Sequence, residues 1–100
     1  MDCNLSGDTT NSIISLSGTM DFSDHEKIRT VIGQLRDQGA KSVIADLSSL
    51  TNIDSAGIGM LLLLDEVGKD AGFSFSVRGV NGQVEQVLNV CNLSEVVNFI

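Results

Sequence analysis

Residues 51–64 read TNIDSAGIGMLLLL, a polar stretch that passes directly into large apolar side chains. Asp54 and Ser55 are both good helix N-caps, because their side-chain oxygens accept hydrogen bonds from the first free backbone N–H groups of a helix. The apolar residues that follow recur with a helical period. We therefore predict a loop-to-helix junction at these two residues and a helix over residues 55–71.

Two glycines, Gly57 and Gly59, stand in the first turns of this helix. Each costs a helix about 1 kcal/mol relative to alanine, so their presence needs a reason. Close packing of the turn on a sheet supplies one reason, and close approach of a partner's backbone supplies another.

This segment does not have the pattern of an active site. Its glycines fit neither GxxxxGK[ST] nor GxGxxG, and no lysine lies near them, so a phosphate-binding loop is not indicated. A serine hydrolase needs a GxSxG elbow and a histidine, but Ser55 lacks the elbow. The single histidine, His25, belongs to the charged start of another predicted helix. We expect no enzymatic activity, no metal site and no cofactor.

A helical wheel divides residues 55–71 into two sides. The side expected to face the core carries Met60, Leu63, Leu64, Val67 and Ala71. The solvent side carries Asp65, Glu66, Lys69 and Asp70. Ile58 and Leu62 project among these charges. Isolated apolar residues are common on protein surfaces, whereas two neighbouring ones beyond a cap serine also suit a docking patch. The residues alone leave both interpretations open.

The rest of the chain alternates between strand-like and helix-like periods, as in a single α/β domain. The predicted strands are Cys3–Leu5, Ser12–Ser17, Ser42–Leu47 and Phe73–Val77. The other predicted helices are Asp24–Gln38 and Gly82–Val90. We predict a turn over Gly7–Asn11, a polar loop over Ser48–Asn52, and either a short helix or a last strand over Leu93–Ile100.

The helix over Asp24–Gln38 has signals at both ends. Ser23 and Glu26 fit a capping box, in which a hydroxyl and a carboxylate each satisfy a free backbone N–H group. Gly39 supplies the left-handed residue on which helices commonly end. The predicted buried stripe consists of Ile28, Val31, Ile32 and Leu35.

Composition narrows the classes of function. Six basic and thirteen acidic residues give a formal charge of −7, and the basic residues are scattered, which argues against nucleic acids and anionic membranes. The longest apolar run, Met60–Leu64, is far shorter than the roughly 20 residues of a membrane helix, and no secretory signal is visible. The two cysteines suggest no disulfide scaffold, and Cys91 continues an apolar helical stripe, so we expect it in the core. These features favour a cytoplasmic domain.

Three motifs resemble one family. VIADL at Val43–Leu47, IDSAGIGML at Ile53–Leu61 and GTMD at Gly18–Asp21 are similar to the signature of STAS domains, the family of the anti-sigma factor antagonists and of domains appended to sulfate transporters. The resemblance covers residues 1–100 as one domain. It implies an α/β fold in which a mixed sheet of about four to five strands is covered by helices.

The resemblance also implies a bacterial signalling role in the regulation of transcription. Ser55 matches the serine that a partner anti-sigma factor, a GHKL-type serine kinase, phosphorylates and that a PP2C-type phosphatase restores. In such antagonists the unmodified form binds the anti-sigma factor. Asp21 and Asp54 match positions that border the docking surface, and Ile58 and Leu62 match positions on the partner-facing helix.

Electrostatics is compatible with such a switch. We expect Asp21 and Asp46 to lie near Ser55 at strand ends, where with Asp54 they would oppose a partner once a phosphoryl group is added. The alternatives for these residues are structural, with Ser55 and Asp54 as ordinary helix caps and Asp46 as a strand-end carboxylate.

Two other functions remain open at this stage. Stand-alone STAS subunits also dock on the ATPase of a lipid-transport ABC system without switching, and nucleotide binding is suggested for some relatives. The small patch suits a monomer or a transient heterocomplex.

Overall fold

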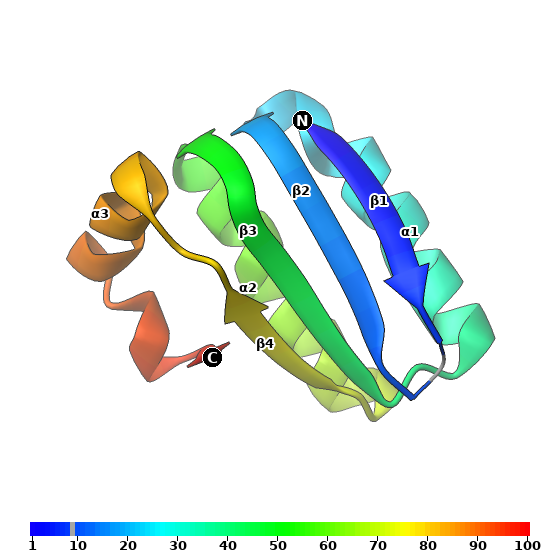
Figure 1. The fold of residues 1–100 in the computed structure, drawn as a ribbon. Coiled ribbons are helices and arrows are strands. Elements are labelled where there is room, and N and C mark those ends of the chain that lie inside the picture. The colour runs from blue at the N-terminus through cyan, green and yellow to red at the C-terminus, as the bar shows by residue number, and fades with distance from the viewer. Residues whose placement is uncertain (9) are drawn as a thin grey trace.

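One sheet of five strands forms the centre of the molecule, in the spatial order β1–β2–β3–β4–β5 (Figure 1). The structure, a computed structural model, describes residues 1–8 and 10–100. The strands are β1 (Asp2–Gly7), β2 (Ser12–Met20), β3 (Ser42–Ile53), β4 (Ser74–Arg78) and β5 (Asn98–Phe99). The α-helices are α1 (His25–Gln38), α2 (Ser55–Ala71) and α3 (Gly82–Val90), and the short 3-10 helices are η1 (Phe22–Asp24) and η2 (Leu93–Glu95).

The sheet is mixed, as the family resemblance implies. β1 and β2 pair antiparallel, whereas β2, β3, β4 and β5 are parallel. The predicted turn over Gly7–Asn11 includes residue 9, which lies outside the described residues. The C-terminal segment, for which helix and strand were both open, contains both, as η2 and β5.

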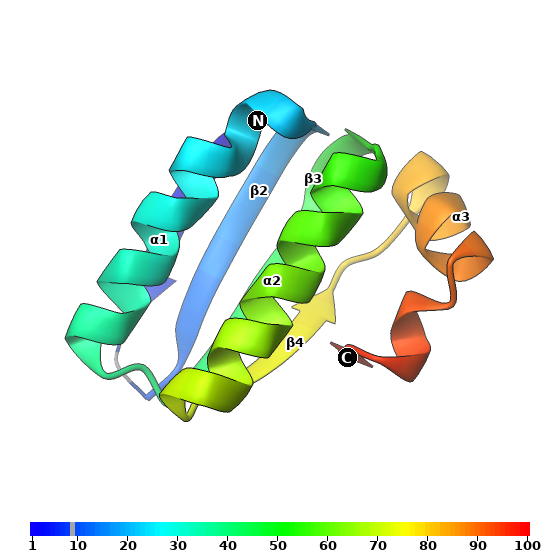
Figure 2. The same ribbon diagram turned by 180° about the vertical axis from the view of Figure 1, so that it is seen from behind.

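The helices cover the sheet unequally. α1 and α2 lie side by side on one face, and α3 lies beside the C-terminal end of β3, beyond the end of β4 (Figure 2). Val43, Ala45 and Leu47 of β3 are fully buried because alternate residues of a strand point to the helix-covered face. Among the described residues no helix covers the other face (Figure 1). Within the same residues, no helix combines the length and the hydropathy that crossing a bilayer requires.

The capping box of the first helix involves other residues than predicted. Asp21, not Ser23, is the cap: its Oδ1 accepts a hydrogen bond from Ser23 N (3.0 Å), and Asp24 Oδ2 accepts one from Asp21 N (2.8 Å). The reason is that η1 adds a turn before α1, so Ser23 lies inside that turn. The predicted stop at Gly39 is confirmed by its left-handed φ of 65°.

The predicted loop over Ser48–Asn52 is wrong, because these residues continue β3 to Ile53. The pairing of β2 with β3 shifts register twice there, between Ser15 and Ser17 and between Gly18 and Thr19. Such bulges break the alternation of inward and outward residues. Buried positions therefore follow at Leu47, Leu50 and Ile53, and the period of two that marks a strand in a sequence is lost.

Two residues expected in the core are exposed. Cys91 follows the last residue of α3 and is its C-cap, so it no longer keeps the helical position that the stripe assumes. Ala71, the last residue of α2, is exposed just before the left-handed Gly72. Leu61, which the wheel does not place on the core side, is fully buried.

Candidate functional site

At the start of α2, one residue caps the helix and the next one is exposed to solvent. Asp54 is the N-cap: its backbone is extended, and its Oδ1 accepts a hydrogen bond from Gly57 N (3.0 Å). Ser55 is the first residue of the helix and is exposed. Within the described residues no hydrogen bond engages the Ser55 hydroxyl. The cap therefore needs only the aspartate, and the serine oxygen is free for chemistry or for a partner.

The ends of β2 and β3 place Asp21 beside this helix start. Met20 and Ile53 are partners in the parallel register, and Asp54 N donates to Met20 O over 3.3 Å. Asp21 follows directly in the chain. Hydrogen bonds from the side chain and the backbone of Ser23 hold the pKa of its carboxyl below the ordinary value. Asp21 and Asp54 thus directly follow neighbouring strand ends beside the start of α2, and their part in a docking surface stays a prediction.

The two glycines have different surroundings. A Cβ on Gly57 would lie 2.5 Å from Ile53 Cγ1 and 3.0 Å from Met20 O, so close packing on the sheet requires this glycine. A Cβ on Gly59 would meet nothing within 4 Å. Close packing on the sheet thus explains Gly57, whereas Gly59 has no packing reason among the described residues.

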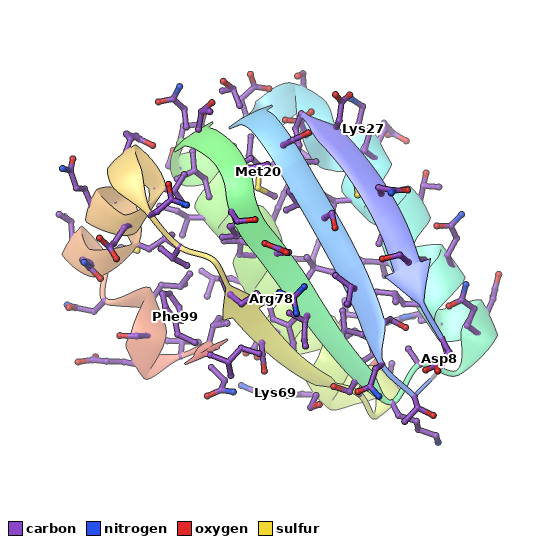
Figure 3. All side chains as sticks on the ribbon, viewed as in Figure 1. Asp8, Met20, Lys27, Lys69, Arg78 and Phe99 are labelled. Carbon is purple, nitrogen blue, oxygen red and sulfur yellow. The ribbon has the colours of Figure 1, made fainter. Side chains whose placement is uncertain are left out.

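Asp46 does not belong to this group, contrary to the prediction. It lies inside β3, between the inward-facing Ala45 and Leu47, so its side chain points to the helix-free face. Its carboxylate accepts hydrogen bonds from Ser48 N (3.0 Å) and from Arg78 Nε (3.3 Å) and Nη2 (3.2 Å). Arg78 lies on the middle of the sheet in Figure 3. Asp46 is therefore a structural carboxylate rather than a neighbour of Ser55.

Beyond the first turn of α2, the exposed aliphatics continue into a groove. Leu62 is 37% exposed, and Ile58 is half-buried. Ile58 lines a groove of about 300 Å³ between α2 and α3, whose other lining residues are Gln86, Val87, Val90 and Cys91.

The apolar stripe of the predicted helix over Gly82–Val90, formed by Val84, Val87, Leu88 and Cys91, includes Val87 and Cys91 of this groove but not Val90. Val90 is 85% exposed and lies outside the stripe. An apolar residue out of phase with a helical stripe is the signal that could have revealed it.

Phe22 is a second exposed apolar residue that the sequence reasoning missed. It is 74% exposed and begins η1, the turn that the hydrogen bonds of Asp21 and Asp24 fix. Its ring meets the ring of His25 edge to face at 5.0 Å. An apolar side chain directly after a turn-forming aspartate is the signal that was available in the sequence. The surface around the start of α2 thus combines two carboxylates, a free hydroxyl and exposed apolar side chains.

Such a surface has the features of a protein-binding site. In the part of the chain that the structure describes, no group of three His, Cys, Asp or Glu side chains could hold a metal ion. Exposed aromatic and aliphatic anchors with a polar rim are typical of protein interfaces.

This chain is similar in sequence and in fold to known proteins. The family model described as "Mlab, STAS domain" matches residues 3–98. The intermembrane phospholipid transport system binding protein MlaB of Escherichia coli is 28% identical over 94 residues, which cover 93% of each chain.

Two solved structures share the fold. An anti-sigma factor antagonist from Mycobacterium paratuberculosis superposes with a TM-score of 0.78 at 19% identity, over 98% of this chain and 83% of that chain. The phosphorylated form of the Bacillus cell fate determinant SpoIIAA gives a TM-score of 0.74 at 20% identity, over 99% and 91%. With the family model matching nearly its whole length, the chain belongs to the STAS domain family.

Proposed function

We propose that this protein is a regulatory docking module that binds a partner protein through the start of α2 and the groove between α2 and α3. We further propose that phosphorylation of Ser55 by a GHKL-type anti-sigma factor serine kinase releases the partner and that a PP2C-type phosphatase reverses the release. The observation that carries this proposal is the exposure of Ser55 at the start of α2. Asp54 is the N-cap, so the Ser55 hydroxyl is not needed to cap the helix.

The electrostatics of the helix start supports a switch of this kind. A phosphoryl group adds about −1.5 to −2 charges, and the helix N-terminus favours such a charge by on the order of 0.3–1 kcal/mol, so the fold tolerates it. Asp21 and Asp54 flank the same turn and would then form one strongly negative surface with the phosphate. A partner that docks on the unmodified hydroxyl would meet this charge and the bulk of the phosphate.

The test uses the GHKL-type serine kinase of the same organism with ATP, followed by intact mass. We expect one phosphoryl group on the wild-type chain and none on Ser55→Ala. In a pull-down with the same kinase, Ser55→Ala should bind and Ser55→Asp should bind at least tenfold more weakly. Phosphorylation of Ser55→Ala, or equal binding of the two variants, would contradict the proposal.

A second candidate function rests on the curated relative. The E. coli protein named as a binding protein of an intermembrane phospholipid transport system aligns over 93% of both chains. In this alternative the same surface docks on the ATPase of a lipid-transport ABC system and Ser55 acts without modification. Co-purification of this chain with such an ATPase from its own organism, unaffected by ATP and unaccompanied by phosphorylation, would favour this function over the first.

A further inference from the structure

An aromatic side chain just before α1 lies outside the groove between α2 and α3. Phe22 is 74% exposed. It lines a depression of about 430 Å³, whose other lining residues are Ser23, His25, Glu26 and Arg29. Large exposed aromatic residues are typical of the anchors that carry most of the affinity at protein interfaces.

The backbone that carries Phe22 is fixed on both sides. Asp21 Oδ1 accepts a hydrogen bond from Ser23 N (3.0 Å), and Asp24 Oδ2 accepts one from Asp21 N (2.8 Å). Asp24 is only 2% exposed, and burial of a carboxylate is costly unless it has partners. These bonds hold the turn in one conformation, so a partner that contacts Phe22 does not have to order a flexible segment.

Phe22 and its depression lie on the side of α1 that faces α2. Arg29 of the depression precedes Arg36 by seven residues, so both lie on one side of the helix. Arg36 Nη2 lies 3.5 Å from Asp70 Oδ2 of α2, and η1 itself lies close to α2. α2 is between α1 and α3 in Figure 2. Phe22 therefore flanks α2 on the side opposite its groove with α3.

The outer surface of α2 between these two places is low at Gly59. Gly59 precedes Leu63 by four residues, and Leu63 lines a groove with Arg36 of α1, so Gly59 lies on the side of α2 toward α1. Ile58 lines the groove toward α3. Ser55 and Gly59 are both exposed, and a Cβ at position 59 would meet nothing within 4 Å. The backbone of a partner can therefore approach α2 closely here.

We propose, on the basis of the docking function above, that the partner spans α2 with one amphipathic helix. This helix crosses α2 at Gly59 and places an apolar side chain on each side of it. One side chain packs against Phe22, and the other enters the groove between α2 and α3. Ser55 lies between the two anchors, so a phosphate on Ser55 would lie beneath the crossing helix and prevent its close approach.

The width of α2 selects a helix as the docking element. An α-helix is about 10 Å across, so the two anchoring side chains have to be about 10 Å apart on one face of the partner. In a helix, residues i and i+7 are about 10.5 Å apart and point in nearly the same direction. In a strand, side chains on one face are about 6.6 or 13 Å apart, and neither spacing fits.

The charges in the depression favour a neutral side chain of the partner. Glu26 and Arg29 have opposite formal charges and line the depression together, one turn apart on α1. A charged side chain placed between them would be attracted by one and repelled by the other, whereas an apolar side chain can pack on the Phe22 ring. Such an apolar centre with a polar rim is the usual arrangement at a protein interface.

Substitution of Phe22 tests the second anchor. The probe is whichever of the two proposed partners the wild-type chain binds, the GHKL-type serine kinase or the lipid-transport ATPase of the same organism. Phe22→Ala should bind it about tenfold or more weakly, and Phe22→Leu, which keeps an apolar side chain, should recover most of the affinity. The urea midpoint of unfolding of Phe22→Ala should equal that of the wild type, because the ring is exposed.

Ile100→Ala is the matched control. Ile100 is 64% exposed, similar to Phe22, but lies at the C-terminus, away from the start of α2 (Figure 1). This variant should bind the partner as tightly as the wild type. Equal effects of Ile100→Ala and Phe22→Ala, or wild-type affinity of Phe22→Ala, would overturn the inference.

Hydrogen exchange of the partner identifies the element that docks. The wild-type chain should protect one helix of the partner that has apolar residues seven positions apart, and Phe22→Ala should protect it less. Protection confined to a strand or a loop of the partner would also overturn the inference. The docking function itself is tested by Ser55→Asp and Val90→Asp, whose weaker binding would stand even if Phe22→Ala bound as the wild type does.

Discussion

At the residue scale, we expect alanine substitutions of the two glycines near the start of α2 to change the stability of the fold in opposite directions. A Cβ at position 57 would press on Ile53 and on the backbone of Met20, so Gly57→Ala should lower the free energy of unfolding by about 1–3 kcal/mol. Gly59 has open space and ordinary helical neighbours, so Gly59→Ala should raise it by about 0.5–1 kcal/mol. Urea denaturation of the two variants measures both effects.

The same pair of variants separates folding from binding. If only a partner's approach explains Gly59, Gly59→Ala should be more stable than the wild type and yet bind the partner more weakly. Unchanged affinity of this stabilised variant would remove that explanation and leave the glycine without a role.

Asp46 provides a pH-dependent prediction. Hydrogen bonds hold the pKa of its carboxyl below the ordinary value of 3.8. The largest effect comes from Ser48, through its backbone N–H, and a smaller one comes from Arg78. On acidification the unfolded chain therefore takes up this proton first. The group stabilises the fold above about pH 3.8, and that contribution is lost as the pH falls through the lower pKa of the folded chain.

The corresponding measurement compares urea unfolding at about pH 5 and about pH 2.5. Asp46→Asn should be less stable than the wild type at the higher pH and should lose less stability on acidification. Arg78→Gln removes one of the partners of the carboxylate and should lie between the two. An unchanged pH dependence in Asp46→Asn would show that the carboxylate does not contribute.

At the scale of elements, the sequence predicts helices better than it predicts the long strand. α2 and α3 have the bounds predicted for them, because a cap, an apolar stripe and a terminal glycine or turn are local signals. β3 was cut short because its second half, Ser48–Ile53, has two register shifts against β2, and a bulge depends on the neighbouring strand rather than on local sequence.

Part of the candidate site could likewise be predicted from the sequence, and part could not. Asp54 and Ser55 could be placed at the helix start because a cap is a local signal. Asp21 was expected beside them through the family resemblance and an assumed arrangement of the sheet, since the predicted strand ended at Ser17 and β2 extends to Met20. Asp46 was misplaced because its position depended on where β3 ends. The out-of-phase Val90 marks an exposed apolar residue on α3, but the groove itself depends on how α2 and α3 pack together across the intervening β4.

That groove makes a prediction for α3. Val90 is 85% exposed and lines the groove with Ile58, so Val90→Asp should weaken partner binding by about tenfold or more, since a buried, uncompensated charge is costly at an interface. The free energy of unfolding should stay nearly unchanged, because the exposed Val90 side chain makes few packing contacts in the folded protein. Val96→Asp is the matched control: Val96 is 55% exposed and does not line the groove. Equal effects of the two variants in a titration would exclude the groove from the docking surface.

At the scale of the whole molecule, the rigidity of the start of α2 determines how phosphorylation of Ser55 would affect binding of a partner. The start of α2 is held from three sides: by the Asp54 cap, by the packing of Gly57 on Ile53, and by the Asp54 N to Met20 O hydrogen bond. A turn fixed in this way has little freedom to move when charge is added, and the helix dipole favours that charge. The switch should therefore act through surface charge and shape rather than through a new backbone conformation.

Amide chemical shifts of wild-type protein and Ser55→Asp test this expectation. The changes should be confined to the ends of β2 and β3, η1 and the first two turns of α2, and the free energy of unfolding should change by less than about 1 kcal/mol. The same variant should bind the partner at least tenfold more weakly. Shifts that spread through α1 and the β1 edge, or a large loss of stability, would instead indicate a conformational switch, and the weaker binding would then have to be explained by rearrangement of the sheet rather than by repulsion at its end.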